Sequence, residues 1–130
     1  MKIKDFTVGQ IVYVFSDEKV DQLMPQKERK AKKYTVAKVG RKYLYVARGD
    51  NADIKTIPQY MLNSFREPEY TDEFLELNVD YGYRSILFPD TRTADEYFEK
   101  KELVRLFETK VRWKDYTLSE LKEVQRILGV

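Results

Sequence analysis

Residues 34–47 read YTVAKV-GR-KYLYVA, two runs rich in β-branched and aromatic residues on either side of a Gly-Arg pair. Runs of this composition and length are typical of β-strands, and two such runs joined by two residues are typical of a hairpin. We predict a hairpin in which Gly40 and Arg41 form a type II′ turn, with a positive φ at Gly40.

A two-residue turn would also fix the register, so that Val39 faces Lys42 and Val36 faces Tyr45. The two faces of the hairpin then differ in chemistry. The small and aliphatic face, predicted to be the interior of a barrel, carries Thr35, Ala37, Val39, Leu44 and Val46. The opposite face carries Tyr34, Val36, Lys38, Tyr43 and Tyr45.

Further strand signals flank the hairpin. Strands are predicted at residues 11–15, 54–57, 73–79 and 83–88. Residues 16–33 have no apolar periodicity and become strongly basic, which indicates a long exposed loop, and residues 58–71 are predicted to be irregular. Five or six short strands favour a small curved antiparallel sheet or a barrel.

Two helices are predicted after Pro89. Thr93 with Glu96, and Thr117 with Glu120, have the spacing of capping boxes, and Gly129 stands where a helix C-cap belongs. Both helices carry apolar stripes that need a surface to cover. We therefore expect one α+β domain spanning 1–130, with a mainly β part at 1–90 and two helices at 91–130 packed on it.

Composition excludes several kinds of chemistry. The 130 residues contain no cysteine and no histidine, so there is no disulfide, no thiolate, no imidazole base and no Cys- or His-based zinc site. Carboxylates are abundant, but no spacing among them matches a metal-binding loop. We expect that the protein is not an enzyme and that it binds no cofactor and no metal. Metal-dependent hydrolysis through these carboxylates is an alternative, and it predicts that Mg²⁺ or Mn²⁺ raises the melting temperature. The lack of a long apolar run or a secretory signal favours a cytoplasmic protein without membrane contact.

A basic and aromatic surface is the leading candidate for a binding site. It combines the loop cations with the outer face of the hairpin: Lys27, Arg29, Lys30, Lys32, Lys33, Tyr34, Lys38, Arg41, Tyr43 and Tyr45. Basic side chains neutralise phosphates, and tyrosines on a sheet can stack on unpaired bases, so nucleic acid is the expected partner. In the alternative interpretation, the tyrosines lie under the C-terminal helices and the cations are simply solvated.

The charge is distributed unevenly behind a net value of +2. Residues 1–50 hold twelve basic and six acidic side chains, whereas residues 51–100 hold five basic and eleven acidic ones. An acidic stretch can imitate phosphates and occupy a basic cleft of another protein. Trp113, between the two predicted helices, could anchor an interface or pack on the core.

The runs at 6–14 and 36–46, with the later Thr117-Leu118-Ser119-Glu120-Leu121, resemble small β-barrel domain proteins of bacterial phages and mobile elements. This resemblance implies a Src-homology-like or KOW-like barrel and assigns no site residues. We expect a non-enzymatic binding module associated with nucleic acid. The alternative is a phage or mobile-element accessory that binds and inhibits a host protein, such as a nucleic-acid-directed defence enzyme. The oligomeric state and the identity of the ligand stay open.

Overall fold

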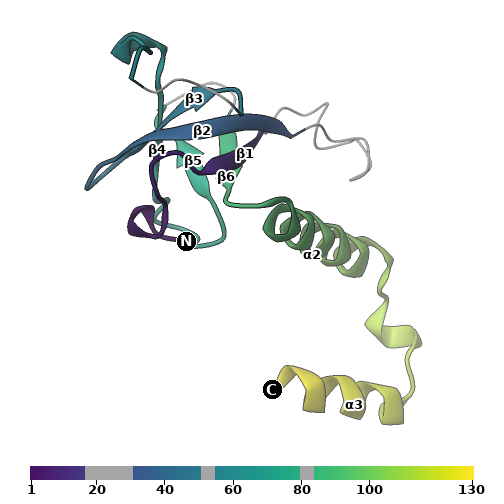
Figure 1. Cartoon of the computed structure of the whole chain (residues 1–130). Coiled ribbons are helices and arrows are strands. Elements are labelled where there is room, and N and C mark those ends of the chain that lie inside the picture. Colours follow the sequence, from purple (N-terminus) through teal and green to yellow (C-terminus); the bar gives the residue numbers. More distant parts are fainter. Residues whose placement is uncertain (17–30, 51–54, 80–83) are drawn as a thin grey trace. The chain divides into compact units, whose positions relative to one another are not determined.

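The computed structural model describes residues 1–16, 31–50, 55–79 and 84–130 (Figure 1). Six antiparallel strands follow one another around a closed barrel, and β1 pairs with β6 to complete it. The strands are β1 (Ile11–Ser16), β2 (Lys32–Val39), β3 (Leu44–Arg48), β4 (Asn63–Arg66), β5 (Leu75–Leu77) and β6 (Ser85–Phe88). A barrel followed by two helices confirms the predicted fold class.

The barrel interior is filled by alternate residues of its strands. Val12 of β1, Leu75 of β5 and Leu87 of β6 have no exposed surface, and the short 3-10 turn η1 (Ile3–Asp5) adds the buried Ile3. Because side chains alternate across a strand, the residues between them point out of the barrel. The outer face is therefore where polar and aromatic side chains can meet.

A second apolar cluster lies on the outer face of β1 and β6. Phe15 and Phe88 pack edge to face with ring centroids 5.9 Å apart, and Phe98 of helix α2 (Thr91–Lys110) lies 5.0 Å from Phe15. Ala94, one turn earlier in the helix, is fully buried. The first two turns of α2 thus cover one part of the barrel wall and leave other parts of it for polar side chains.

The predicted register of the hairpin is wrong. Val39 pairs with Leu44 and Lys38 pairs with Tyr45, so residues 40–43 form a four-residue connection. Gly40 does not have a positive φ. Its N–H donates to the Tyr43 carbonyl oxygen at 3.0 Å, and a Cβ at Gly40 would lie 2.9 Å from that oxygen. Close approach, rather than backbone handedness, therefore requires glycine at this position.

A β-bulge at Ala37 changes which residues face inward. The ladder between β2 and β3 shifts between Val36 and Lys38, so Val36 pairs with Val46 and is completely buried in the core. The prediction that Val36 shares the outer face with Tyr45 is wrong, because the extra residue reverses the alternation. Lys38 and Tyr45 do share that face.

The strand predicted at 54–57 is not found among the described residues of that segment. Residues 55–57 form a turn, residue 54 lies outside the described residues, and the strand is β4, inside the segment predicted to be irregular. A short 3-10 turn η3 (Gln59–Met61) precedes it. Phe65 is the only large apolar residue of β4 and is 1% exposed, so one side chain secures this strand to the core.

Both helices form where they are predicted, with one shifted start. In α2 the Thr93 N–H donates to the Asp90 carboxylate at 2.7 Å, so the helix begins earlier than expected. The second helix, α3 (Leu118–Leu128), has the predicted capping box of Thr117 and Glu120. Gly129 ends it with a left-handed φ of 71°. A 3-10 turn η4 (Trp113–Asp115) separates the two helices.

The chain divides into two compact units, Met1–Phe98 and Glu99–Val130. Within the second unit the apolar side chains of the helices stay exposed, among them Leu103, Phe107, Leu118, Ile127 and Leu128. The predicted packing of the helices on the sheet stays a prediction beyond Phe98. Among the described residues no helix is long and apolar enough to cross a membrane, and no group of three acidic residues could hold a metal ion.

Candidate nucleic-acid interface

The cations of the loop before β2 are only partly within the described structure. Lys27, Arg29 and Lys30 lie outside the described residues. Lys32 and Lys33 are exposed at the start of β2, and the Lys33 ammonium lies 3.7 Å from the Asp50 carboxylate. A pair this exposed contributes little to stability, so both lysines remain accessible to an anionic partner.

The other predicted residues gather at the far end of β2, with one exception. Tyr34 is half-buried and packs against the core of the barrel. Lys38 and Tyr45 form a cross-strand pair on the outer face, and the Lys38 ammonium lies 5.6 Å from the centre of the Tyr45 ring. The Tyr43 ring stands edge to face with the Tyr45 ring, with their centroids 6.4 Å apart.

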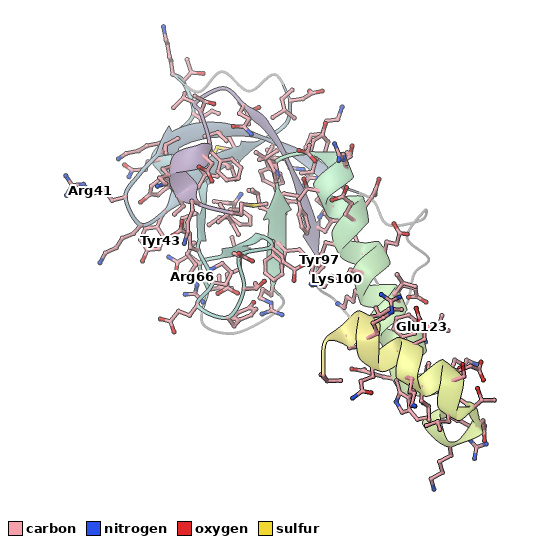
Figure 2. All side chains as sticks on the ribbon, turned by 90° about the horizontal axis from the view of Figure 1, so that it is seen from below. Arg41, Tyr43, Arg66, Tyr97, Lys100 and Glu123 are labelled. Carbon is pink, nitrogen blue, oxygen red and sulfur yellow. The ribbon has the colours of Figure 1, made fainter. Side chains whose placement is uncertain are left out.

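Arg41 completes this group at the tip of the hairpin. It is exposed, and Figure 2 shows its side chain extending away from the barrel, with Tyr43 closer to the wall. We call Lys38, Arg41, Tyr43 and Tyr45 the hairpin patch. Lys32 and Val39 mark the two ends of β2, about 23 Å apart at the rise of an extended strand. The loop lysines and the hairpin patch are therefore separate surfaces.

The hairpin patch continues onto β4. Tyr45 pairs with Ser64 and Leu44 pairs with Phe65, so Arg66, the residue after Phe65, lies at the end of this ladder that is nearer Tyr43. Arg66 in turn pairs with Glu76 of β5. Figure 2 shows Tyr43 and Arg66 on the same side of the barrel, as this register requires. Side chains of β2, β3, β4 and β5 thus share one outer surface.

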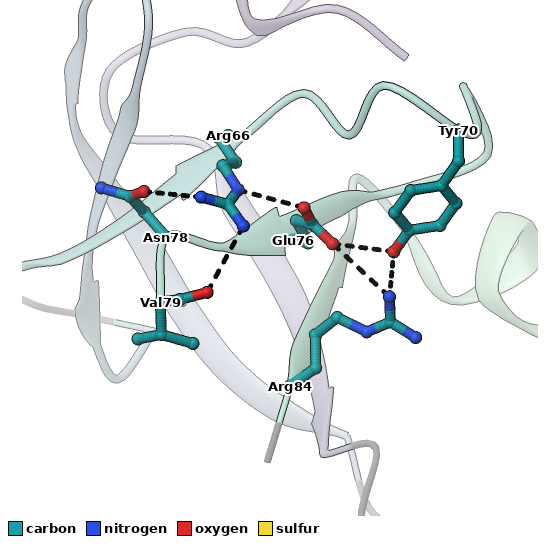
Figure 3. A network of polar contacts seen from close by, with 6 residues as sticks. All are labelled: Arg66, Tyr70, Glu76, Asn78, Val79 and Arg84. Carbon is teal, nitrogen blue, oxygen red and sulfur yellow. Dashed lines mark hydrogen bonds and ion pairs between the residues drawn. The ribbon is translucent and has the colours of Figure 1, made fainter. Parts of the chain in front are cut away.

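Glu76 is the centre of a polar network on this surface (Figure 3). Its side chain is 8% exposed and accepts a hydrogen bond from the Arg66 Nε at 3.0 Å and from the Tyr70 hydroxyl at 2.7 Å. The Arg84 guanidinium lies 3.6 Å from the second carboxylate oxygen. A carboxylate removed from water needs such partners, because desolvating a charge is costly.

Arg66 is held by more than this carboxylate. Its Nη1 donates to the Asn78 side-chain oxygen at 3.1 Å, and its Nη2 donates to the Val79 carbonyl at 3.3 Å. Three acceptors within residues 76–79 therefore fix the guanidinium, although about a third of the side chain is exposed. A fixed guanidinium loses little conformational entropy when it binds a ligand.

Tyr70 and Arg84 form the exposed rim of the network. The Arg84 guanidinium lies 5.4 Å from the centre of the Tyr70 ring and also donates to the Tyr70 hydroxyl. Burial of the hydroxyl, with its hydrogen bond to Glu76, raises the pKa of Tyr70 to about 12. The phenol is therefore protonated at neutral pH and acts as a donor, while Tyr70 as a whole is 59% exposed.

Sequence reasoning did not single out Arg66, Tyr70 or Arg84. They lie in the half of the chain with an acidic excess, where Glu76 counts as one carboxylate among eleven. The available signal was that Arg66 and Arg84 are two of only five basic residues there. Nothing in their spacing shows that they converge on one buried carboxylate.

The barrel and its basic, aromatic outer surface define a small β-barrel binding module. The family model of the phage ProQ C-terminal-like domain matches residues 1–129, and the chain belongs to that family. This confirms the resemblance to phage-encoded small domains. A search of curated proteins and a search of solved structures found no significant match to this chain.

Proposed function

We propose that this domain binds single-stranded RNA without chemical turnover, through the hairpin patch. The observation that carries the proposal is the grouping of Lys38, Arg41, Tyr43 and Tyr45 on one outer surface. The family match adds support, since ProQ is an RNA-binding family.

The chemistry of the patch suits an unpaired strand. An aromatic ring can stack on any base, with a contribution of about 1–3 kcal/mol for each stacked base. Tyr43 and Tyr45 are inclined by 74°, so they present ring faces in two directions. Lys38 and Arg41 supply the positive charge that phosphates need. Duplex RNA would hide its base faces, so it should bind more weakly.

Fluorescence anisotropy with a labelled single-stranded RNA tests this proposal. Tyr43→Leu with Tyr45→Leu should weaken binding at least tenfold, because two stacking faces are lost. Lys38→Gln with Arg41→Gln should lower the salt dependence of binding. The slope of log K against log salt concentration should become less steep by about 1.4, because two phosphate contacts are lost and each contributes about 0.7 for a single strand. Tyr60→Leu is the matched control, since Tyr60 is 87% exposed on a different segment.

Two results would contradict the assignment to the hairpin. One is unchanged affinity in both double variants. The other is loss of binding in Lys30→Gln, Lys32→Gln, Lys33→Gln while the hairpin variants bind normally, which would move the site to the loop end of β2. Duplex RNA and single-stranded DNA of the same sequence, titrated in parallel, report the strand and sugar preference.

A protein partner is the second candidate function. The exposed apolar residues of the second unit, such as Leu118, Ile127 and Leu128, favour it. Absence of RNA binding even at low salt, together with recovery of one defined host protein from nuclease-treated bacterial lysate, would support this candidate. Loss of that recovery in Leu118→Ser with Leu128→Ser would locate the contact on α3.

A further inference from the structure

We propose a second RNA subsite on the same outer surface, formed by Arg66, Tyr70 and Arg84 around Glu76, which takes a nucleotide further along the strand held by the hairpin patch. We call these four residues the network subsite. The inference rests on the proposed function, because it extends the path of the same RNA strand.

Continuity of the sheet places the two sites next to each other. Tyr45 pairs with Ser64 across β3 and β4, and Arg66 pairs with Glu76 across β4 and β5. Neighbouring strands are about 4.8 Å apart, so the step from β3 to β5 covers about 10 Å. A strand of several nucleotides therefore reaches both sites on one continuous surface.

Burial differs among the charges of the network, and this decides what it presents to a ligand. The Glu76 side chain is 8% exposed, whereas those of Arg66 and Arg84 are 34% and 43% exposed. The negative charge is thus the inner member of the cluster and the positive groups are the outer ones. Arginine side chains that stay partly exposed can bind phosphate, which is the anion that an RNA strand carries.

Tyr70 adds a stacking surface beside these cations. Tyr70 as a residue is 59% exposed, its hydroxyl is tied to Glu76, and its ring lies between the Arg84 guanidinium, 5.4 Å from the ring centre, and Phe74, whose ring centroid is 6.2 Å away. A largely exposed tyrosine that is anchored at its hydroxyl end is preorganised to stack on a base. The subsite therefore combines one stacking platform with phosphate-binding groups, the same chemistry as in the hairpin patch.

An oligonucleotide length series tests the inference. The probe is labelled oligouridylate from about 4 to about 16 nucleotides, the range over which single-stranded binders of barrel type are usually filled. For the wild-type protein, affinity should rise with length until both subsites are occupied. Tyr70→Leu and Arg84→Gln should each lower the affinity for long oligonucleotides about tenfold. The affinity for the shortest oligonucleotides should stay unchanged.

Matched variants separate binding from folding. Tyr70→Phe keeps the ring but loses the hydroxyl anchor to Glu76, so its affinity for long oligonucleotides should lie between those of the wild type and Tyr70→Leu. Arg92→Gln is the control that should bind like the wild type, because it removes an arginine that is 88% exposed and pairs with Glu96 on α2. Thermal unfolding of every variant is measured beside the titrations. If Tyr70→Leu is poorly folded, it loses affinity for oligonucleotides of all lengths. Arg84→Lys then provides the decisive comparison, because this variant should keep the fold and show a weaker dependence of affinity on oligonucleotide length.

The outcomes distinguish this inference from the proposed function. If the hairpin variants lose binding while Tyr70→Leu and Arg84→Gln bind long oligonucleotides like the wild type, the network subsite is overturned and the proposed function stands. An equal loss at all lengths in well-folded variants also overturns it. If the wild type binds no oligonucleotide at low salt, the proposed function itself fails.

Discussion

Replacing Glu76 by glutamine should destabilise the barrel by about 2 kcal/mol. The carboxylate accepts hydrogen bonds from Arg66 and from Tyr70 while its side chain is 8% exposed. Hydrogen bonds to a charged group contribute about 1.5–3 kcal/mol, and breaking a fully buried ion pair costs about 3–5 kcal/mol. Glutamine keeps one acceptor oxygen, and both guanidiniums retain contact with water, so the lower end of these values applies.

Thermal unfolding followed by circular dichroism at neutral pH measures this effect. For a unit of 60–100 residues, 1 kcal/mol shifts Tm by roughly 4–8 °C, so Glu76→Gln should lower Tm by about 10 °C. The matched control is Glu96→Gln. The Glu96 side chain is 65% exposed and pairs with Arg92 at 3.2 Å on the surface of α2. An exposed pair of this kind contributes about 0.3–0.5 kcal/mol, which corresponds to a Tm change of about 2 °C.

The difference in Tm change between Glu76→Gln and Glu96→Gln tests whether Glu76 is a shielded carboxylate. Equal and small Tm changes in Glu76→Gln and Glu96→Gln would refute the assignment of Glu76 as a shielded carboxylate that holds the network together. The network subsite would then lack the fixed geometry on which its preorganisation depends.

Two other predictions follow from the same geometry. Tyr70 should ionise near pH 12 in an absorbance titration, and Tyr70→Phe should remove that step. Because burial raises the pKa of Tyr70 in the folded protein above the ordinary tyrosine value of about 10, its contribution to stability is complete below about pH 10 and is lost as the pH rises through 12. A titration in which Tyr70→Phe removes no step near pH 12 would contradict this. Val36→Ala should lower the free energy of unfolding, measured with a denaturant, by about 2 kcal/mol, because Val36 is fully buried. Lys38→Ala should change this free energy by no more than about 0.5 kcal/mol. Equal effects of these two changes would contradict the bulged register.

Local sequence patterns were sufficient for several elements. The β-branched run at 11–15 forms β1, and the runs at 73–79 and 83–88 contain β5 and β6. Thr117 with Glu120 forms a capping box at the start of α3, because the two side chains satisfy backbone donors only a few residues away. Signals of this kind depend on neighbours in the chain, so the sequence carries them directly.

The hairpin register was beyond local reasoning. Gly-Arg between two strand-like runs predicts a two-residue turn, but Gly40 is part of a four-residue connection and Ala37 forms a bulge. Bulges increase local twist and bend a strand, which closure of a barrel requires. Whether Val36 faces the core therefore depends on the closure of all six strands and not on the pattern around it.

Half of the candidate interface was visible in the sequence and half was not. The basic and aromatic side chains of the hairpin lie within a few residues of one another, so their grouping could be predicted. The structure differs in that Tyr34 is half-buried against the core and Lys32 and Lys33 lie apart at the other end of β2. Arg66, Tyr70 and Arg84 come together only because β4, β5 and β6 pair side by side around Glu76. The sequence determined five of the strands and both helices, since these depend on local propensity and capping, but it did not predict β4. Only the tertiary structure decided which charge is buried and which charges stay partly exposed, because that depends on side chains brought together from separate strands.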